Sequence, residues 1–149
     1  MRSRFLPAGE KKQVMSDLEN QFGIKKIPGI LIESGKEKTR LFTGSLTREQ
    51  LVELDKAVRI ELIGLYAIKK EDTYRLSIDG SYVFEQQITK SIVELTEEES
   101  KQWMRGNDLQ KEGPRGVVVM KFGRFFLGCG KSNGTLIYNY VPKNRRINR

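Results

Sequence analysis

The first stretch of the chain with regular apolar spacing covers residues 10–22. Its apolar residues recur every three or four positions, which predicts a helix, and Gly23 follows where a C-cap glycine is expected. The next apolar and β-branched segment, residues 27–32, predicts a strand. Residues 40–43 are predicted to pair back on it, with the turn at Gly35. The pattern therefore opens with a helix and a hairpin.

A second helix is predicted over residues 47–57, opened by a capping box and turning Leu51 and Leu54 inward. Residues 60–68 are almost continuously apolar, which predicts a buried strand with a bulge or a close backbone contact at Gly64. Residues 80–88 are ambiguous, with Asp79 placed to start a helix. The other predicted elements are strands over 74–78 and 92–95, a helix over 96–104, and strands over 115–121, 124–128 and 135–141.

The chain changes character near residue 87. Helices and strands alternate before it, whereas short strands punctuated by glycine predominate after it, which is typical of a small barrel. We predict an α+β fold in two domains, an α/β domain over residues 1–87 and a β-rich domain over residues 88–149. The 149 residues suffice for two small domains, and the 38% of apolar residues supply their cores.

Positive charge is concentrated at the end of the chain. Residues 105–149 hold ten of the 27 Lys and Arg residues but two of the 19 Asp and Glu residues, so the whole net charge of +8 lies there. Such an asymmetry favours a polyanionic partner. A disordered basic tail is the other explanation. Because the apolar segments 117–120 and 125–127 require burial, we expect a tail only from about Arg145.

The composition disfavours several classes of function. The chain has no histidine, which is the commonest general base and zinc ligand. Cys129 is the sole cysteine, which excludes an internal disulfide and indicates a reducing, cytoplasmic compartment. No apolar run approaches the roughly 20 residues of a membrane span, and the start of the chain lacks the apolar stretch of a signal peptide. We expect no catalytic activity, no cofactor, no metal and no membrane partner.

Residues 128–132 resemble a phosphate-binding loop only superficially, because Phe125 stands where the first glycine is required. We expect a strand there instead, with Cys129 buried and its glycines allowing another backbone to approach. Residues 97–99 are consecutive glutamates that suit the start of a helix better than a metal site. Trp103 is expected to anchor the core between the two halves, with base stacking as the alternative.

The residues that say most about the partner are a set of basic residues with aromatic and amide side chains interleaved. Lys and Arg bind phosphates, and aromatic faces and amide edges bind unstacked bases. An acid-free stretch of 37 residues is unusual for an ordinary solvated surface, so we favour a nucleic acid partner. The basic residues are Arg115, Lys121, Arg124, Lys131, Lys143, Arg145 and Arg146, and the interleaved ones are Tyr138, Asn139 and Tyr140.

The same region resembles a known RNA-binding domain. Residues 103–109, 116–119 and 126–131 resemble a PUA domain, a small RNA-binding pseudobarrel. Residues 138–146 look like the end of the RNA-binding domain appended to cytosine-5 RNA methyltransferases of the Nol/Nop/Sun family, where Asn-x-x-Pro-Lys and Arg recur at similar spacing. The resemblance implies RNA-binding roles for Arg105, Lys131, Asn139, Lys143, Arg145 and Arg146.

The first half is similar to the pre-PUA domain of nucleolar ribosome-biogenesis factors, with a helix, a hairpin and a second helix before two strands. The stand-alone arrangement is similar to archaeal proteins of this group. The sequence has no Pro-Cys motif and no room for a cofactor domain, so the resemblance implies RNA binding without methyl transfer. The implied architecture is a pre-PUA α/β domain followed by a PUA-like β-pseudobarrel.

We therefore expect a non-catalytic protein that binds structured rRNA or tRNA in ribosome biogenesis or RNA modification, with no DNA partner. Two alternatives stay open. The neutral N-terminal half could dock an RNA methyltransferase or a ribosome-assembly factor, which would make the chain an adaptor. A small RNA-modifying enzyme could instead use carboxylates, of which Asp79 near Arg75 is the best candidate.

Overall fold

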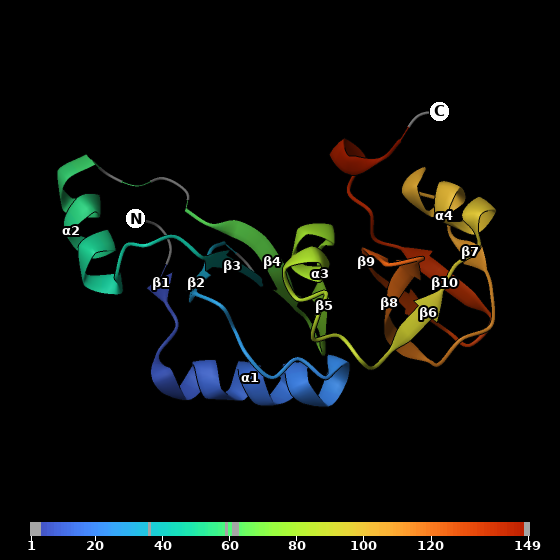
Figure 1. The fold of residues 1–149 in the computed structure, drawn as a ribbon, viewed down its shortest axis with the longest axis horizontal. Helices are drawn as coiled ribbons and strands as arrows, with labels where there is room; N and C mark the ends of the chain where they lie inside the picture. The colour runs from blue at the N-terminus through green and yellow to red at the C-terminus, as the bar shows by residue number, and fades with distance from the viewer. Residues whose placement is uncertain (1–3, 36, 59, 61–62, 148–149) are drawn as a thin grey trace.

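Over residues 4–35, 37–58, 60 and 63–147, which the computed structural model describes, the chain forms two five-stranded sheets (Figure 1). The first has the strand order β1-β2-β3-β4-β5 and belongs to the N-terminal half. The second has the order β6-β8-β9-β10-β7 and belongs to the C-terminal half. Helices accompany both sheets, so the predicted α+β class is confirmed.

The first sheet is antiparallel throughout and follows chain order. The predicted first helix and hairpin are confirmed, although the first arm of the hairpin begins three residues later than expected. The elements of this half are β1 (Arg4–Phe5), α1 (Ala8–Phe22), β2 (Ile30–Glu33), β3 (Lys38–Phe42), α2 (Arg48–Val58), β4 (Leu65–Lys70), β5 (Tyr74–Leu76) and α3 (Ile78–Val83).

Helix α1 buries one face and ends at a glycine, as its sequence predicts. Val14, Leu18 and Phe22 are buried on that face. Gly23 adopts a left-handed conformation with φ of 83°, and its N–H bonds back to the last turn of the helix. This geometry favours glycine because a side chain would be strained there.

Helix α2 begins with the predicted capping box, in which Thr47 and Gln50 exchange backbone–side-chain hydrogen bonds of 2.9 and 3.1 Å. Leu51 is fully buried. The prediction that Leu54 also faces inward is wrong, because 41% of it is exposed. The helix lies at the outer end of the molecule (Figure 1), where the neighbouring elements cover Leu51 but leave the next turn open.

Strand β4 begins at Leu65, later than the predicted strand over 60–68, of which Glu61 and Leu62 lie outside the described residues. The predicted close contact at Gly64 is confirmed. Gly64 has a φ of 78°, and a Cβ added there would lie 2.7 Å from the Leu41 carbonyl oxygen of β3. A side chain at this position would therefore push β3 away from the start of β4.

The second half contains the predicted elements in the predicted order, and in addition β7 and η1, which were not predicted. Its strands pair antiparallel except for β6, which runs parallel to β8. The predicted capping box of Thr96 and Glu99 is present at the start of α4. The elements are β6 (Ile92–Glu94), α4 (Glu97–Met104), β7 (Leu109–Gln110), β8 (Gly116–Phe122), β9 (Phe125–Ser132), β10 (Leu136–Asn139) and the 3-10 helix η1 (Lys143–Arg145).

Helix α3 joins the two halves and resolves the ambiguous segment after β5 (Figure 1). Ser77, rather than Asp79, caps its start by accepting a hydrogen bond of 2.9 Å from Gly80 N–H. Gly80 lies directly against β4, and the Gly128 N–H of β9 donates to Ser81 Oγ at 3.1 Å. The helix is therefore fixed to a strand of each sheet.

The apolar core consists of two clusters. One is shared by both halves: Val119, Phe126 and Cys129 of the second sheet pack with residues such as Leu76 of the first. The other belongs mainly to the second half and contains Trp103. The prediction that Trp103 anchors the core is confirmed, and Ile78 of the first half packs against its cluster. Its indole extends from α4 onto β9, where Nε1 donates to the Leu127 carbonyl at 3.0 Å. The domain boundary at residue 87 stays a prediction.

The segment 128–132 lies within β9, so the predicted strand is confirmed and the phosphate-loop interpretation does not apply. Gly130 allows the close approach expected there. A Cβ at Gly130 would lie 2.5 Å from the Trp103 ring and 2.7 Å from the Tyr138 carbonyl oxygen. The small residue thus lets both the indole and the neighbouring strand β10 pack against β9.

We expect the substitution Gly130→Ala to lower the free energy of unfolding by about 1–3 kcal/mol, because the added methyl overpacks a closed core. Gly113→Ala is the matched control, since a Cβ there would meet its neighbours at ordinary distances of 3.6–4.0 Å. Urea titration followed by circular dichroism measures both. Equal stability of the two variants would contradict the packing described here.

Candidate nucleic-acid interface

The predicted basic residues do not form one continuous surface. The structure divides them among three places, all in the second half. Arg105, Lys143, Arg145 and Arg146 lie at the end of α4 and around η1; Arg115 and Lys131 lie at the end of β9 next to Asn133-Gly134; and Lys121 and Arg124 lie at the β8–β9 hairpin.

The end of the chain is tied to α4 rather than loose. Arg146 packs over Gly106 and donates a hydrogen bond from Nε to the Val141 carbonyl at 3.1 Å. Ile147 N–H donates to the Met104 carbonyl at 2.7 Å. The prediction of a loose tail from Arg145 is therefore wrong for the residues as far as Ile147, because these contacts hold the segment against the helix. Residues 148 and 149 lie outside the described residues.

Arg145 connects η1 to the first half of the chain. Its Nη1 lies 2.9 Å from Asp79 Oδ2 at the start of α3. Both side chains are almost half exposed, so the pair adds little stability and leaves Arg145 able to exchange Asp79 for a phosphate. Asp79 is thus paired with Arg145, whereas Arg75 is paired with Glu71 at 3.4 Å. The carboxylate site expected of Asp79 near Arg75 is not formed.

Asn139 has a structural task. Its Nδ2 donates to the carbonyls of Trp103 at 2.8 Å and Asn107 at 3.0 Å, and its Oδ1 accepts from Val141 N–H at 2.7 Å. The amide thereby holds α4 against β10. Its predicted contact with RNA stays a prediction, which would require these bonds to open. Base stacking by Trp103 is excluded because the indole is fully buried.

Lys131 and Tyr138 lie directly opposite each other on β9 and β10, so their exposed side chains share one face of the sheet. The exposed Arg115 packs beside the turn at Gly134, at the same end of the sheet. A cation next to an accessible aromatic ring is the arrangement that binds a phosphate and an adjoining base.

Lys121 and Arg124 lie at the other end of β8 and β9. The Lys121 ammonium is 5.2 Å from the centre of the Phe126 ring, and the Arg124 guanidinium is 5.1 Å from that of Phe125. Tyr82, 68% exposed, comes from α3 into the same region. These two cations are therefore separated from the other predicted residues by the length of the strands.

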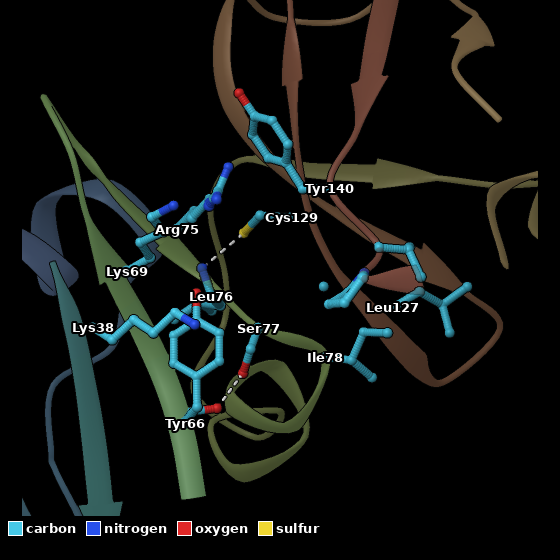
Figure 2. Close-up of a pocket in the computed structure, with 13 residues that line it drawn as sticks. Lys38, Tyr66, Lys69, Arg75, Leu76, Ser77, Ile78, Leu127, Cys129 and Tyr140 are labelled. Atoms are coloured by element: carbon cyan, nitrogen blue, oxygen red, sulfur yellow. Dashed lines mark hydrogen bonds between the residues drawn. The ribbon is translucent and has the colours of Figure 1, made fainter. Parts of the chain in front are cut away.

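Sequence reasoning missed a cavity of about 270 Å³ between the two sheets, here named the seam pocket (Figure 2). Of the predicted residues, it contains Tyr140. The residues that give it its character are Lys38, Lys69, Arg75, Tyr66, Tyr140 and Cys129. Among the described residues that line it there is no carboxylate. Residues 1–104 carry equal numbers of basic and acidic residues, so the sequence gives no sign that the fold would gather three cations here.

Two of the three cations of the seam pocket are packed on aromatic rings. The Arg75 guanidinium lies 3.9 Å from the centre of the Tyr140 ring, and the Lys38 ammonium lies 5.2 Å from that of Tyr66 (Figure 2). Burial raises the pKa of the Tyr66 phenol, and the Arg75 guanidinium partly opposes this rise. The phenol is therefore neutral at physiological pH, and the pocket keeps its positive character.

Cys129 is buried at the back of the seam pocket, as predicted. Its sulfur accepts a hydrogen bond from Leu76 N–H at 3.2 Å. Burial raises the pKa of the thiol to about 12, while the Leu76 hydrogen bond and the Arg75 charge act in the opposite direction. The thiol therefore stays protonated and unreactive in the folded protein.

We expect iodoacetamide at pH 8 to leave Cys129 unmodified in the native protein and to alkylate it after unfolding in guanidinium, as read by mass spectrometry. The pKa of the thiol is higher in the folded protein than in the unfolded chain. The contribution of Cys129 to the free energy of unfolding is therefore fully present below about pH 9 and declines as the pH rises from there toward 12. Rapid alkylation of the folded chain would show that the thiol is exposed.

Comparisons with known proteins find a matching family model for the second half of the chain. Residues 90–147 match the family model described as the methyltransferase RsmF PUA domain. The second half of the chain is therefore similar to a PUA domain. The match covers the second sheet, α4 and η1, so the predicted PUA-like pseudobarrel is confirmed together with the resemblance to domains appended to RNA methyltransferases.

Two curated relatives of this chain carry the name ribosomal RNA small subunit methyltransferase F. The proteins from Aeromonas salmonicida and Aeromonas hydrophila are each 25% identical to it, over 144 and 141 residues. Each alignment covers 93% of this chain, so it includes both halves. The chain spans 28% of the length of these relatives.

Two kinds of feature are not found among the described residues. None of the helices described is long and apolar enough to cross a membrane. The structure, where described, brings together no group of three His, Cys, Asp or Glu side chains that could hold a metal ion. Glu99, from the acidic cluster, instead caps α4 and contacts Lys111 at 3.0 Å.

Proposed function

We propose that this protein binds structured RNA through its PUA domain and has no catalytic activity of its own. The observation that carries the proposal is that residues 90–147, which match the PUA domain, present exposed cations beside an accessible aromatic ring. Lys131, Tyr138 and Arg115 form one such group, and Lys143 and Arg145 supply further exposed cations at η1, in a separate place on the domain. The cations would neutralise phosphates, and the ring would stack on an unpaired base.

We propose rRNA as the partner, with tRNA as the second choice, and a cytoplasmic role in ribosome biogenesis or RNA modification. The names of the two relatives, which refer to small-subunit rRNA, support this choice. An A-form duplex hides its base edges in a deep groove, so base contacts would be few and would involve unpaired nucleotides. We expect no binding to DNA of the same sequence, because the 2′-hydroxyl would contribute to recognition.

Cross-linking in the cells of origin, followed by sequencing of the attached RNA, tests this function. A sharp peak on rRNA is the expected result and would locate the site. A peak on tRNA would instead indicate a role in tRNA modification or translation. If the protein enriches no RNA above a basic control protein of similar charge, the proposal is wrong.

A second candidate function is that of an adaptor, and one observation favours it. Helix α2 and the residues before it expose apolar side chains far from the basic surfaces: Leu46, Val52, Leu54 and Val58 are 38%, 38%, 41% and 64% exposed. Leu54 and Val58 are four residues apart and share one face of α2, which could dock a methyltransferase or an assembly factor. Co-purification of the same partner by the wild type but not by the variant Leu54→Ser/Val58→Ser would support it.

A further inference from the structure

The seam pocket has the chemistry of a nucleotide site. We propose that it binds one unpaired nucleotide together with its phosphate, so that the N-terminal half takes part in recognition. For a nucleotide within RNA, this inference rests on the proposed function. The chemistry of the pocket also fits a free nucleoside monophosphate, and the experiment below separates the two sources.

The three cations of the pocket form a row across the first sheet. In the strand register, Lys38 of β3 lies opposite Lys69 of β4, and Lys69 lies opposite Arg75 of β5. All three side chains therefore share one face. Like charges placed directly opposite each other on a sheet are destabilising. Glu71 is 3.5 Å from Lys69 and 3.4 Å from Arg75, which leaves the row with an excess of two positive charges. A phosphate in the pocket would relieve this repulsion.

The remaining walls suit a base and a sugar. Tyr140 is held in place by stacking on Arg75. Apolar side chains of Ile78, Leu127 and Val141 complete the wall on the side of the second half. An aromatic ring fixed beside apolar surface stacks on any base, because every base has a π-face. A cation row facing such a wall matches a nucleotide, which carries its charge at one end and its ring at the other.

The size of the pocket excludes a duplex, and its position suits an unpaired nucleotide of a bound RNA strand. A volume of about 270 Å³ is below the usual range of ligand pockets and far too small for a duplex. A second hollow of similar volume shares Lys38 and Tyr66 with it and extends to Asn144 and Arg145. An RNA strand held at η1 by the PUA domain can therefore pass along this path and place its next unpaired nucleotide in the seam pocket.

The test compares two double variants with the same change in charge. Lys38→Gln/Lys69→Gln removes two cations of the row, while Lys25→Gln/Lys26→Gln removes two exposed cations elsewhere in the same half. The probes are an rRNA stem-loop with unpaired nucleotides, a fully paired duplex of equal length, and free AMP. We expect the first variant to bind the stem-loop about tenfold more weakly than the wild type. The duplex affinity of both variants should stay within about twofold.

A second readout is 2-aminopurine placed in the loop, whose fluorescence is quenched when the base stacks on a ring. Quenching by the wild type that is lost in Lys38→Gln/Lys69→Gln supports the pocket. If the wild type binds the stem-loop and the two variants bind it equally, the pocket inference is wrong and RNA binding by the PUA domain stands. The wild type could instead bind AMP through Lys38 and Lys69 but bind no RNA. That result would support the pocket as a nucleotide site and contradict the proposed function. Binding of neither probe overturns both.

Discussion

Replacing Arg115, Lys131 and Lys143 together by glutamate is expected to lower the affinity for RNA by a factor of about 100 or more. Each replacement removes a charged contact with a phosphate, which contributes about 1.5–3 kcal/mol, and adds repulsion. The three side chains are exposed in the PUA domain, so the fold should tolerate the change. Filter binding to an rRNA stem-loop at one salt concentration measures the loss.

The matched control reverses three exposed lysines of the first half, Lys12, Lys25 and Lys26, with the same change in net charge. It should weaken binding much less, because these lysines lie outside the PUA domain. Arg145 and Arg146 are left unchanged since they also hold η1 in place. Equal losses in the two triple variants would mean that net charge, rather than this surface, governs binding.

Replacing Trp103 by alanine is expected to lower the free energy of unfolding by about 3–5 kcal/mol. The indole is fully buried, packs against Gly130 and donates to the Leu127 carbonyl. The substitution would leave a cavity and an unpaired buried carbonyl. Trp103→Phe keeps most of the volume and should cost less, which separates the two effects. Denaturant titration measures both variants.

Tryptophan fluorescence gives an independent check, since Trp103 is the sole tryptophan of the chain. We expect the blue-shifted emission of a buried indole that RNA does not quench. An alanine variant that keeps its stability but loses RNA binding would instead show that the indole contacts a base. Quenching of the wild-type emission on addition of RNA would lead to the same conclusion.

Local signals in the sequence predicted most of the elements because their causes are local. The pairs Thr47–Gln50 and Thr96–Glu99 carry the whole geometry of a capping box within four residues. Gly23 ends α1 through its own backbone conformation. Leu54 was misplaced because burial depends on what a helix packs against, and nothing in the spacing of α2 shows that its second turn faces solvent.

The seam pocket was not predictable because it depends on strand register and on the contact between halves. Lys38, Lys69 and Arg75 are spread over 38 residues of the chain, and pairing of β3, β4 and β5 aligns them. Tyr140 was predicted from its place in the basic segment, but its stacking partner comes from the other half. Similarly, Asn139 fits an RNA-binding motif in the sequence, whereas the structure shows that its amide braces α4.

The salt dependence of RNA binding tests the central claim most directly. If the PUA domain neutralises roughly four to six phosphates, the logarithm of the association constant should fall with the logarithm of the salt concentration at a slope of about −3 to −5. Filter binding of an rRNA stem-loop over a series of salt concentrations gives this slope. A value in that range is the predicted result. A slope near zero would contradict the account, because the exposed cations of the PUA domain would then make no contact with the phosphate backbone.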